Sequence, residues 1–390
     1  MNTNENENVE KVIENINFET ENENNLIQSE SFNTSNDKNF KNLELIKNSQ
    51  FASNEISQAP KKVHYSNISL IRLLATIFII TYHFLYYWTD VAQTYFPFYF
   101  AVPIFLFISG FLYSKKQIKD AKKFFFKNYV KILVPVILFF AIYFTIFLIF
   151  FIFNIKLELI EVVPCGKNAY IFGHLWFIYA ICLCYFFVPL INFFITNKTN
   201  KEKLILFISF IILICLIDIF LMVFCGSCSM FIPFLIGYFF KYLYEKIGVK
   251  AKTALSILGL LVFILSSVFH YYLVNFIGNF KYFELVKELT IVLMGVSFTV
   301  FLLISFEFLN KKDIKTQKLL NISDKYSFYL YIVHPIFMLG GLSAKKITNN
   351  IYLAFFLVII FTIGFSVILE FLTQKICNKV FNLKKNKSKI

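Results

Sequence analysis

Long apolar runs constrain this chain more than any other feature. Ten of them follow one another from Ser66 onward, and several reach the roughly 18 to 20 residues that a helix needs to cross a bilayer. The runs do not alternate apolar with polar side chains, which argues against a transmembrane β-barrel. The sequence therefore predicts an all-α, polytopic transmembrane helix bundle of about ten helices. The runs lie near residues 67–88, 97–114, 132–153, 174–195, 204–224, 229–244, 253–275, 287–307, 326–343 and 351–373.

The charge of the chain is divided between two unlike parts. Residues 1–60 hold 4 Lys, 11 acidic residues and 15 Asn, a composition that predicts a disordered cytoplasmic tail and not a signal peptide. Beyond them lysines are in excess, and they lie in short loops between the apolar runs. That placement indicates membrane topology and argues against nucleic acid as a partner. The lysine-rich loops, above all 115–131, predict that both termini are cytoplasmic.

Three regions follow from this division. The acidic tail at 1–60 precedes a ten-helix membrane domain at 66–375, and a basic cytoplasmic tail at 376–390 ends the sequence. The ninth run is interrupted by His334-Pro335, so a broken or tilted helix is expected there. Cys225 and Cys228 lie in a loop expected outside, where they form either a local disulfide or two separate thiols.

One apolar run carries two ionisable side chains. Arg72 is the only arginine of the chain, and His83 follows eleven residues later. Eleven residues are about three helical turns, so the two side chains share one face, about 16 Å apart along the axis. An arginine at a bilayer centre costs about 2.5–3.5 kcal/mol, which makes the pair a candidate functional site. The alternative is that Arg72 snorkels to lipid phosphates while His83 bonds a neighbouring helix.

Other histidines lie in or near the apolar runs. His174 and Trp176 open the fourth run, His334 lies within the ninth, and His270 ends the seventh. No pair has the spacing of a metal site with a nearby carboxylate, so no metal is expected. The chain also lacks a G-x-S-x-G elbow, a P-loop and a Rossmann fingerprint. The Ser-Gly pair at 109–110 is, on its own, a signal for close helix packing.

Five short motifs nevertheless occur in order along the membrane domain. They comprise Arg72 and His83; Pro103, Phe105, Ser109, Gly110 and Phe111; Lys127, Lys131 and Pro135; His174 and Trp176; and Tyr331 and His334. In this set and order, from about residue 67 to residue 374, the chain resembles the acyltransferase 3 family, and within it the stand-alone surface-polysaccharide O-acyltransferases. It departs from that family in having lysines in the basic loop, where arginine is frequent. The resemblance also implies a further carboxylate on a late helix, for which Glu370 is the candidate.

The resemblance implies transfer of an acyl group, usually acetyl from acetyl-CoA, to a hydroxyl of a cell-envelope polysaccharide or a lipid-linked sugar. The enzyme would lie in the cytoplasmic membrane of a bacterium, among membrane lipids, with acyl-CoA as its donor substrate and no bound cofactor. We expect Arg72, Lys127 and Lys131 to hold the anionic part of the donor. His83 then acts as general base or carries the acyl group. The expected substrate-pocket residues are Ser109, His174, Trp176, Tyr331 and His334.

Two other classes of function compete with this interpretation. Ten helices, a broken ninth helix and buried ionisable groups also occur in transporters of small solutes. No repeat relates the two halves of the sequence, which weighs against a transporter. A non-catalytic membrane subunit is the third class, and the five motifs weigh against it.

Overall fold

The computed structural model describes residues 65–88, 98–153, 175–221, 231–277, 283–311, 314–339 and 342–387. Within these ranges all regular structure is helical, and each predicted apolar run overlaps one α-helix. The α-helices are α3 (Ser66–Trp88), α5 (Ala101–Tyr113), α6 (Ala121–Ile152), α7 (Trp176–Ile195), α8 (Asn200–Leu221), α9 (Phe231–Tyr244), α10 (Val249–Tyr272), α11 (Phe283–Ser305), α12 (Ile314–Val333) and α13 (Ile351–Lys387). Short helical turns add η1 (Phe98–Phe100), η3 (Leu273–Ile277), η4 (Glu307–Lys311), η5 (His334–Phe337) and η7 (Ala344–Lys346).

Six of the described helical segments are long and apolar enough to cross a membrane, by length and composition. They contain α3, α6, α7, α10, α11 and α13. By contrast α5 and α9, with 13 and 14 residues, span only about 20 Å at 1.5 Å per residue, less than the roughly 30 Å of a bilayer core. The number of ten crossings and the cytoplasmic location of the termini therefore stay predictions.

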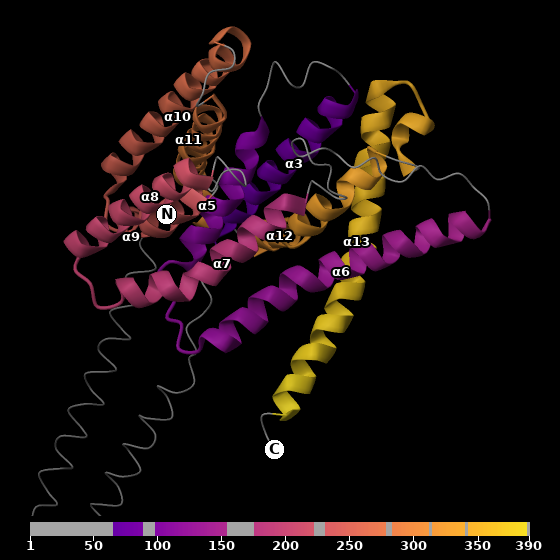
Figure 1. Cartoon of the computed structure of the whole chain (residues 1–390), viewed down its shortest axis with the longest axis horizontal. Helices are drawn as coiled ribbons and strands as arrows, with labels where there is room; N and C mark the ends of the chain where they lie inside the picture. The colour runs from indigo at the N-terminus through magenta and orange to yellow at the C-terminus, as the bar shows by residue number, and fades with distance from the viewer. Residues whose placement is uncertain are drawn as a thin grey trace, which may run out of the picture. The chain divides into compact units, whose positions relative to one another are not determined.

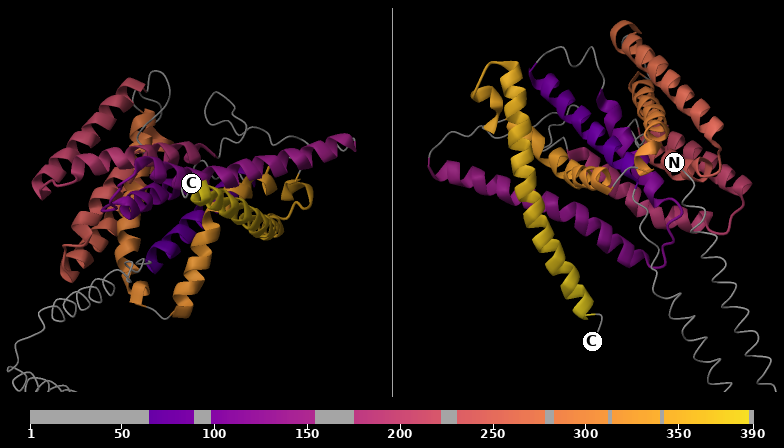
Figure 2. Two further views of the ribbon diagram at one scale, coloured as in Figure 1. Left: turned by 90° about the horizontal axis from the view of Figure 1, so that it is seen from below. Right: turned by 180° about the vertical axis from the view of Figure 1, so that it is seen from behind.

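Helix α3 lies in the middle of the bundle. It contacts α5 and α11 on one side and α12 on the other, as Figure 1 shows. Helix α12 in turn packs on α13, which crosses the long helix α6, while α10 and α11 form a hairpin on the far side of α3 (Figure 2). Any residue on the α12-facing side of α3 is consequently enclosed by other helices.

The distribution of polar side chains is the reverse of that in a soluble protein. Large apolar side chains on the outer helices are exposed, among them Ile137, Phe193 and Leu265 at 62%, 76% and 68%. Polar side chains such as Thr76 and Ser327 are buried between helices. A lipid solvent favours this arrangement, because apolar groups can face the acyl chains while polar groups need partners inside the bundle.

Helices α6, α12 and α13 extend well beyond the predicted apolar runs, and α12 begins at Ile314, ahead of the run predicted from residue 326. Helix α6 begins at Ala121, where the Asp120 side chain accepts a hydrogen bond of 2.9 Å from the Lys123 amide and caps the helix. Most of the predicted basic loop at 115–131 is therefore helical, and its lysines project from a rigid element. Helix α13 likewise continues to Lys387, so the predicted basic tail at 376–390 is helical as far as it is described. The proposed tail at 1–60 lies outside the described residues.

Helices α5 and α9 approach each other through glycines. A methyl group on Gly110 would overlap the carbonyl oxygen of Phe234, and a methyl group on Gly237 would overlap that of Phe107. The sequence signal for close packing at Ser109-Gly110 is thus confirmed. Because Gly110 occupies the α9 side of α5, the neighbouring Ser109 faces a different part of the bundle.

The two glycines make the α5–α9 contact sensitive to one added methyl group. We expect Gly237→Ala to lower the free energy of unfolding by about 1–3 kcal/mol, since backbone atoms must move to accept the new carbon. Gly364→Ala is the matched control, because its Cβ would meet nothing within 4 Å and alanine favours the helix by up to about 1 kcal/mol. Denaturant titration of the purified protein in detergent measures both, and equal stability of the two variants would contradict the close contact.

Candidate functional site

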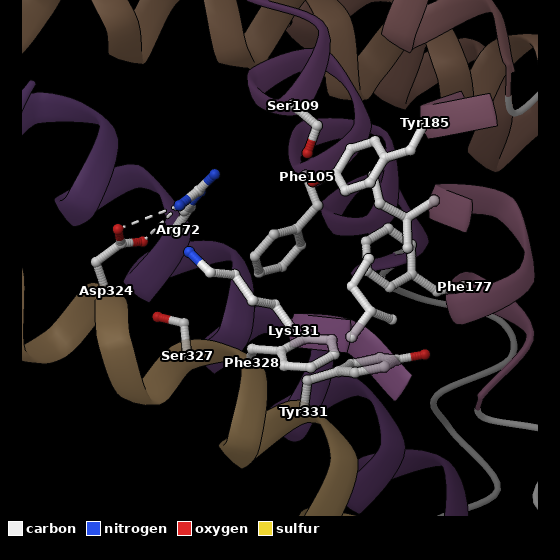
Figure 3. Close-up of a pocket in the computed structure, with 12 residues that line it drawn as sticks. Arg72, Phe105, Ser109, Lys131, Phe177, Tyr185, Asp324, Ser327, Phe328 and Tyr331 are labelled. Carbon is white, nitrogen blue, oxygen red and sulfur yellow. Dashed lines mark hydrogen bonds and ion pairs between the residues drawn. The ribbon is translucent and has the colours of Figure 1, made fainter. Parts of the chain in front are cut away.

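An ion pair joins α3 to α12 inside the bundle. Arg72 Nη1 donates to both carboxylate oxygens of Asp324, at 2.9 Å to Oδ1 and 3.1 Å to Oδ2, as Figure 3 shows. The two side chains are only 24% and 22% exposed. Arg72 therefore points toward α12 and its charge is compensated there, which is what a cation in a low-dielectric region requires.

Four candidate side chains lie on one face of α12 and of the turn η5 that follows it. Asp324, Ser327, Tyr331 and His334 follow one another at three- or four-residue steps, so they stack along the side that meets α3. Lys325 is rotated from Asp324 by about 100° around the helix axis, and it reaches Glu370 of α13 instead, at 2.6 Å. Two successive residues of α12 thus tie it to two different neighbours.

A cavity of about 190 Å³ opens beside the Arg72–Asp324 pair (Figure 3). We call it the inner cavity. Its walls come from α3, α5, α6, α7 and α12, and they are aromatic or aliphatic apart from the charged and hydroxyl groups. The lining residues are Arg72, Phe105, Ser109, Lys131, Ile132, Phe177, Ile181, Tyr185, Asp324, Ser327, Phe328 and Tyr331.

A second and larger cavity, of about 1250 Å³, adjoins the inner cavity. We call it the basic cavity, because five lysines and Arg72 line it and Asp120 is its single lining acid. Arg72, Lys131 and Phe328 line both cavities, so the two meet at the arginine. The basic cavity is lined by Arg72, Asp120, Lys122, Lys123, Phe126, Lys127, Lys131, Lys325, Phe328, Tyr329, Thr373, Gln374, Cys377, Asn378 and Phe381.

The lysines of the basic cavity that belong to α6 are aligned because α6 begins at Ala121, before its apolar part. Lys123, Lys127 and Lys131 are spaced by four residues, so they form one row along α6 that faces the basic cavity. In Figure 3 the Lys131 amino group extends toward the Arg72–Asp324 pair. Such a row of cations presents a continuous binding surface for an extended, multiply charged anion.

A pair of imidazoles lies at the opposite end of the same two helices. The ring centroids of His83 on α3 and His334 at the end of α12 are 5.2 Å apart. His334 is fully buried, and its ring is 6.1 Å from that of Tyr331. His83 lines neither the inner nor the basic cavity. The residue of the inner cavity that adjoins the pair is Tyr331, through its contact with His334.

Five of the nine predicted site residues line the two cavities, and His83 and His334 lie beside each other outside both. Arg72, Lys131, Ser109 and Tyr331 line the inner cavity, while Lys127 lines the basic one. Trp176 begins α7, packs on the core and lines neither cavity. Glu370 pairs with Lys325 and lines neither cavity. His174 lies outside the described residues, as do Cys225 and Cys228 with their possible disulfide.

Sequence reasoning missed Asp324, although a signal for it exists. The ninth apolar run is predicted from residue 326, so Asp324 lies just outside it, whereas α12 begins at Ile314. Asp324 is ten residues before His334 and seven before Tyr331, so it belongs to the same helical face. An acid in register with two motif residues was therefore the available clue.

Comparison with known proteins bears on this geometry. A family model described as an acyltransferase domain matches residues 65–371, which covers all but the last part of the described helices. The chain belongs to the acyltransferase 3 family. No curated protein matches it, and no solved structure does. The chain is thus a membrane acyltransferase, which favours an enzyme over a transporter or a non-catalytic subunit.

The Arg72–Asp324 pair is expected to couple energetically across the α3–α12 contact. In a double-mutant cycle we compare the loss of unfolding free energy in Arg72→Gln, in Asp324→Asn and in the double variant. The loss in the double variant should be about 1–3 kcal/mol smaller than the sum of the two single losses, because each single substitution leaves one buried charge without its counter-charge. The exposed pair Lys198–Glu202 is the control, and its cycle should show no measurable coupling. Strict additivity at Arg72–Asp324 in detergent would show that the pair does not hold the helices together.

Proposed function

We propose that this acyltransferase moves an acyl group, acetyl above all, from acyl-CoA to a hydroxyl of a cell-envelope polysaccharide or a lipid-linked sugar, in the cytoplasmic membrane. The observation that carries the proposal is the junction of the two cavities at Arg72. A large cavity lined by lysines meets there a smaller cavity with mostly aromatic and aliphatic walls, and Tyr331 of the smaller cavity adjoins His334. Acyl-CoA has the same sequence of chemistry, with phosphates at one end and a thioester at the other.

The basic cavity would take the phosphates of the donor. Lys123, Lys127 and Lys131 offer ammonium groups along α6, and Lys325 adds one from α12. Arg72 donates to Asp324 through Nη1. Its other N–H groups would bind acyl-CoA where the two cavities meet. The basic cavity lies among the N-terminal part of α6 and the C-terminal part of α13, at the end of the bundle expected to be cytoplasmic, where acyl-CoA is supplied.

The acyl end would occupy the inner cavity. Arg72, Lys131 and Asp324 gather at one side of that cavity, and Phe105, Phe177 and Tyr331 form other parts of its wall (Figure 3). An uncharged acyl group suits aromatic walls, and the volume of about 190 Å³ favours a small group. The size of the inner cavity therefore supports acetyl over a longer acyl group such as succinyl.

The chemistry would take place at His83. The imidazole accepts the proton of the acceptor hydroxyl as its oxygen attacks the thioester carbonyl, the carbon–sulfur bond breaks, and the proton passes to the thiolate of CoA. Transient acylation of His83 is the covalent form of the same step. Tyr331 lines the inner cavity and its ring centroid is 6.1 Å from that of His334, so the thioester would approach His83 from the Tyr331 side of that cavity.

The proposal is tested with membranes that contain the full chain and envelope glycans. Radiolabelled acetyl-CoA should release CoA and label an envelope fraction, and succinyl-CoA should be consumed at least tenfold more slowly. His83→Ala should lower the turnover number by roughly 10²–10⁴, the usual contribution of a general base. Absence of thioester consumption by well-inserted wild type would refute the donor, and an active His83→Ala would refute the base.

The lysine row should determine donor affinity and leave turnover unchanged. Lys127→Gln and Lys131→Gln are each expected to raise the KM for acetyl-CoA roughly 3–10-fold, because each removes one charge-assisted contact to phosphate. Lys198→Gln is the matched control, since Lys198 pairs with Glu202 at the surface and lines neither cavity. Unchanged KM values in both row variants would place the donor elsewhere.

A further inference from the structure

The orientation of the His334 side chain follows from the proline that comes after it in the sequence. In a continuing α-helix the carbonyl of Tyr331 would accept from the amide of residue 335, but Pro335 has no N–H. Helix α12 ends at Val333, and the turn η5 begins at His334. The His334 ring donates through Nδ1 to the Tyr331 carbonyl instead, at 2.8 Å, with the Leu330 carbonyl at 3.2 Å.

That contact fixes the tautomer of His334. A carbonyl oxygen can only accept, so Nδ1 must carry the proton, and in the neutral ring Nε2 then carries a lone pair. The His334 side chain is fully buried. The proline and the histidine together therefore present an oriented hydrogen-bond acceptor inside the bundle.

The neighbour of this acceptor is His83. The two ring centroids are 5.2 Å apart, with an angle of 37° between the planes, a separation that allows ring nitrogens to come within hydrogen-bonding distance. Tyr82 and Tyr87 surround His83 on α3, with centroids at 5.4 and 6.3 Å. Without a partner for one of its nitrogens, the His83 imidazole could adopt either tautomer among these rings.

We propose that His334 is the positioning residue for His83. No hydrogen bond joins the two rings as they lie in this structure, and a rotation of the His83 ring would bring one of its nitrogens to His334 Nε2. His334 would then accept from that nitrogen, which leaves the lone pair of the other His83 nitrogen to take the proton of the acceptor hydroxyl. When His83 is protonated, the same bond stabilises the imidazolium. This inference rests on the proposed function, in which His83 is the base, and assigns to His334 a role other than lining the substrate pocket.

Two isosteric substitutions separate positioning from simple helix capping. Asn at 334 puts an amide donor where Nδ1 lies, so it keeps the bond to the Tyr331 carbonyl and loses the acceptor toward His83. Gln at 334 puts a carbonyl oxygen near the place of Nε2, so it keeps the acceptor and loses the cap. His270→Asn is the matched control, a buried histidine on α10 whose Nδ1 lies 2.8 Å from Thr290 Oγ1.

We expect His334→Asn to lower kcat roughly 10–100-fold, the usual effect of removing a group that orients a functional histidine. The KM for acetyl-CoA should change less than twofold, because the lysine row holds the donor at the other end of the helices. His334→Gln should recover to within about tenfold of wild type, and His270→Asn should match wild type. A His334→Asn variant as active as wild type, or one no less active than His334→Gln, would overturn the proposal.

A spectroscopic measurement keeps the two proposals separable. The chain has five histidines, so ¹⁵N-histidine solid-state NMR in bilayers can be assigned by single substitutions. We expect His334 to be protonated at Nδ1 and the His83 nitrogen shifts to change in His334→Asn. Nε2 protonation of His334, or unchanged His83 shifts, would overturn the positioning role even with an active enzyme. If the wild type consumes no thioester, the proposed function fails instead, whatever the spectrum.

Discussion

A charge that enters a membrane bundle must find a counter-charge, and that requirement fixes the relation of α3 to α12. Arg72 meets Asp324 with one guanidinium nitrogen between two carboxylate oxygens, and sliding either helix by one turn would separate them. Histidines follow eleven residues later on α3 and ten residues later on α12, about 16 and 15 Å along each axis. The ion pair therefore also sets the meeting of His83 with His334.

The two contacts together require α3 and α12 to run parallel. On each helix the residue of the ion pair comes first in the chain and the histidine follows it. Two such parallel helices can have different side chains at their two ends. One end is cationic and wide, where the basic cavity takes its lysines from α6, and the other is apolar and contains the imidazoles. In the proposed reaction the charged donor and the acceptor would arrive from opposite sides, and this separation would help to keep water from the thioester.

Much of the fold and part of the candidate site could be predicted because the signals are local. Ten apolar runs predicted ten helices, and helical periodicity placed Arg72 and His83 on one face of α3. Lysines 127 and 131 were expected in a loop, yet they project from α6, since the cap at Asp120 starts that helix earlier. Hydropathy marks where lipid covers a helix, and it cannot mark the part of the helix that extends beyond the apolar run.

The sequence alone determined that this chain is a helical membrane protein with a lone arginine and a histidine in register, because hydropathy and the 3.6-residue period act over a few turns. Only the tertiary structure decided that Asp324, 252 positions away, neutralises Arg72, that Glu370 pairs with Lys325, and that His334 adjoins His83. Which acid meets which cation depends on how helices distant in the chain rotate and slide against one another. That choice is made by the packing of the whole bundle, where close contacts such as that of Gly110 with α9 leave few alternatives.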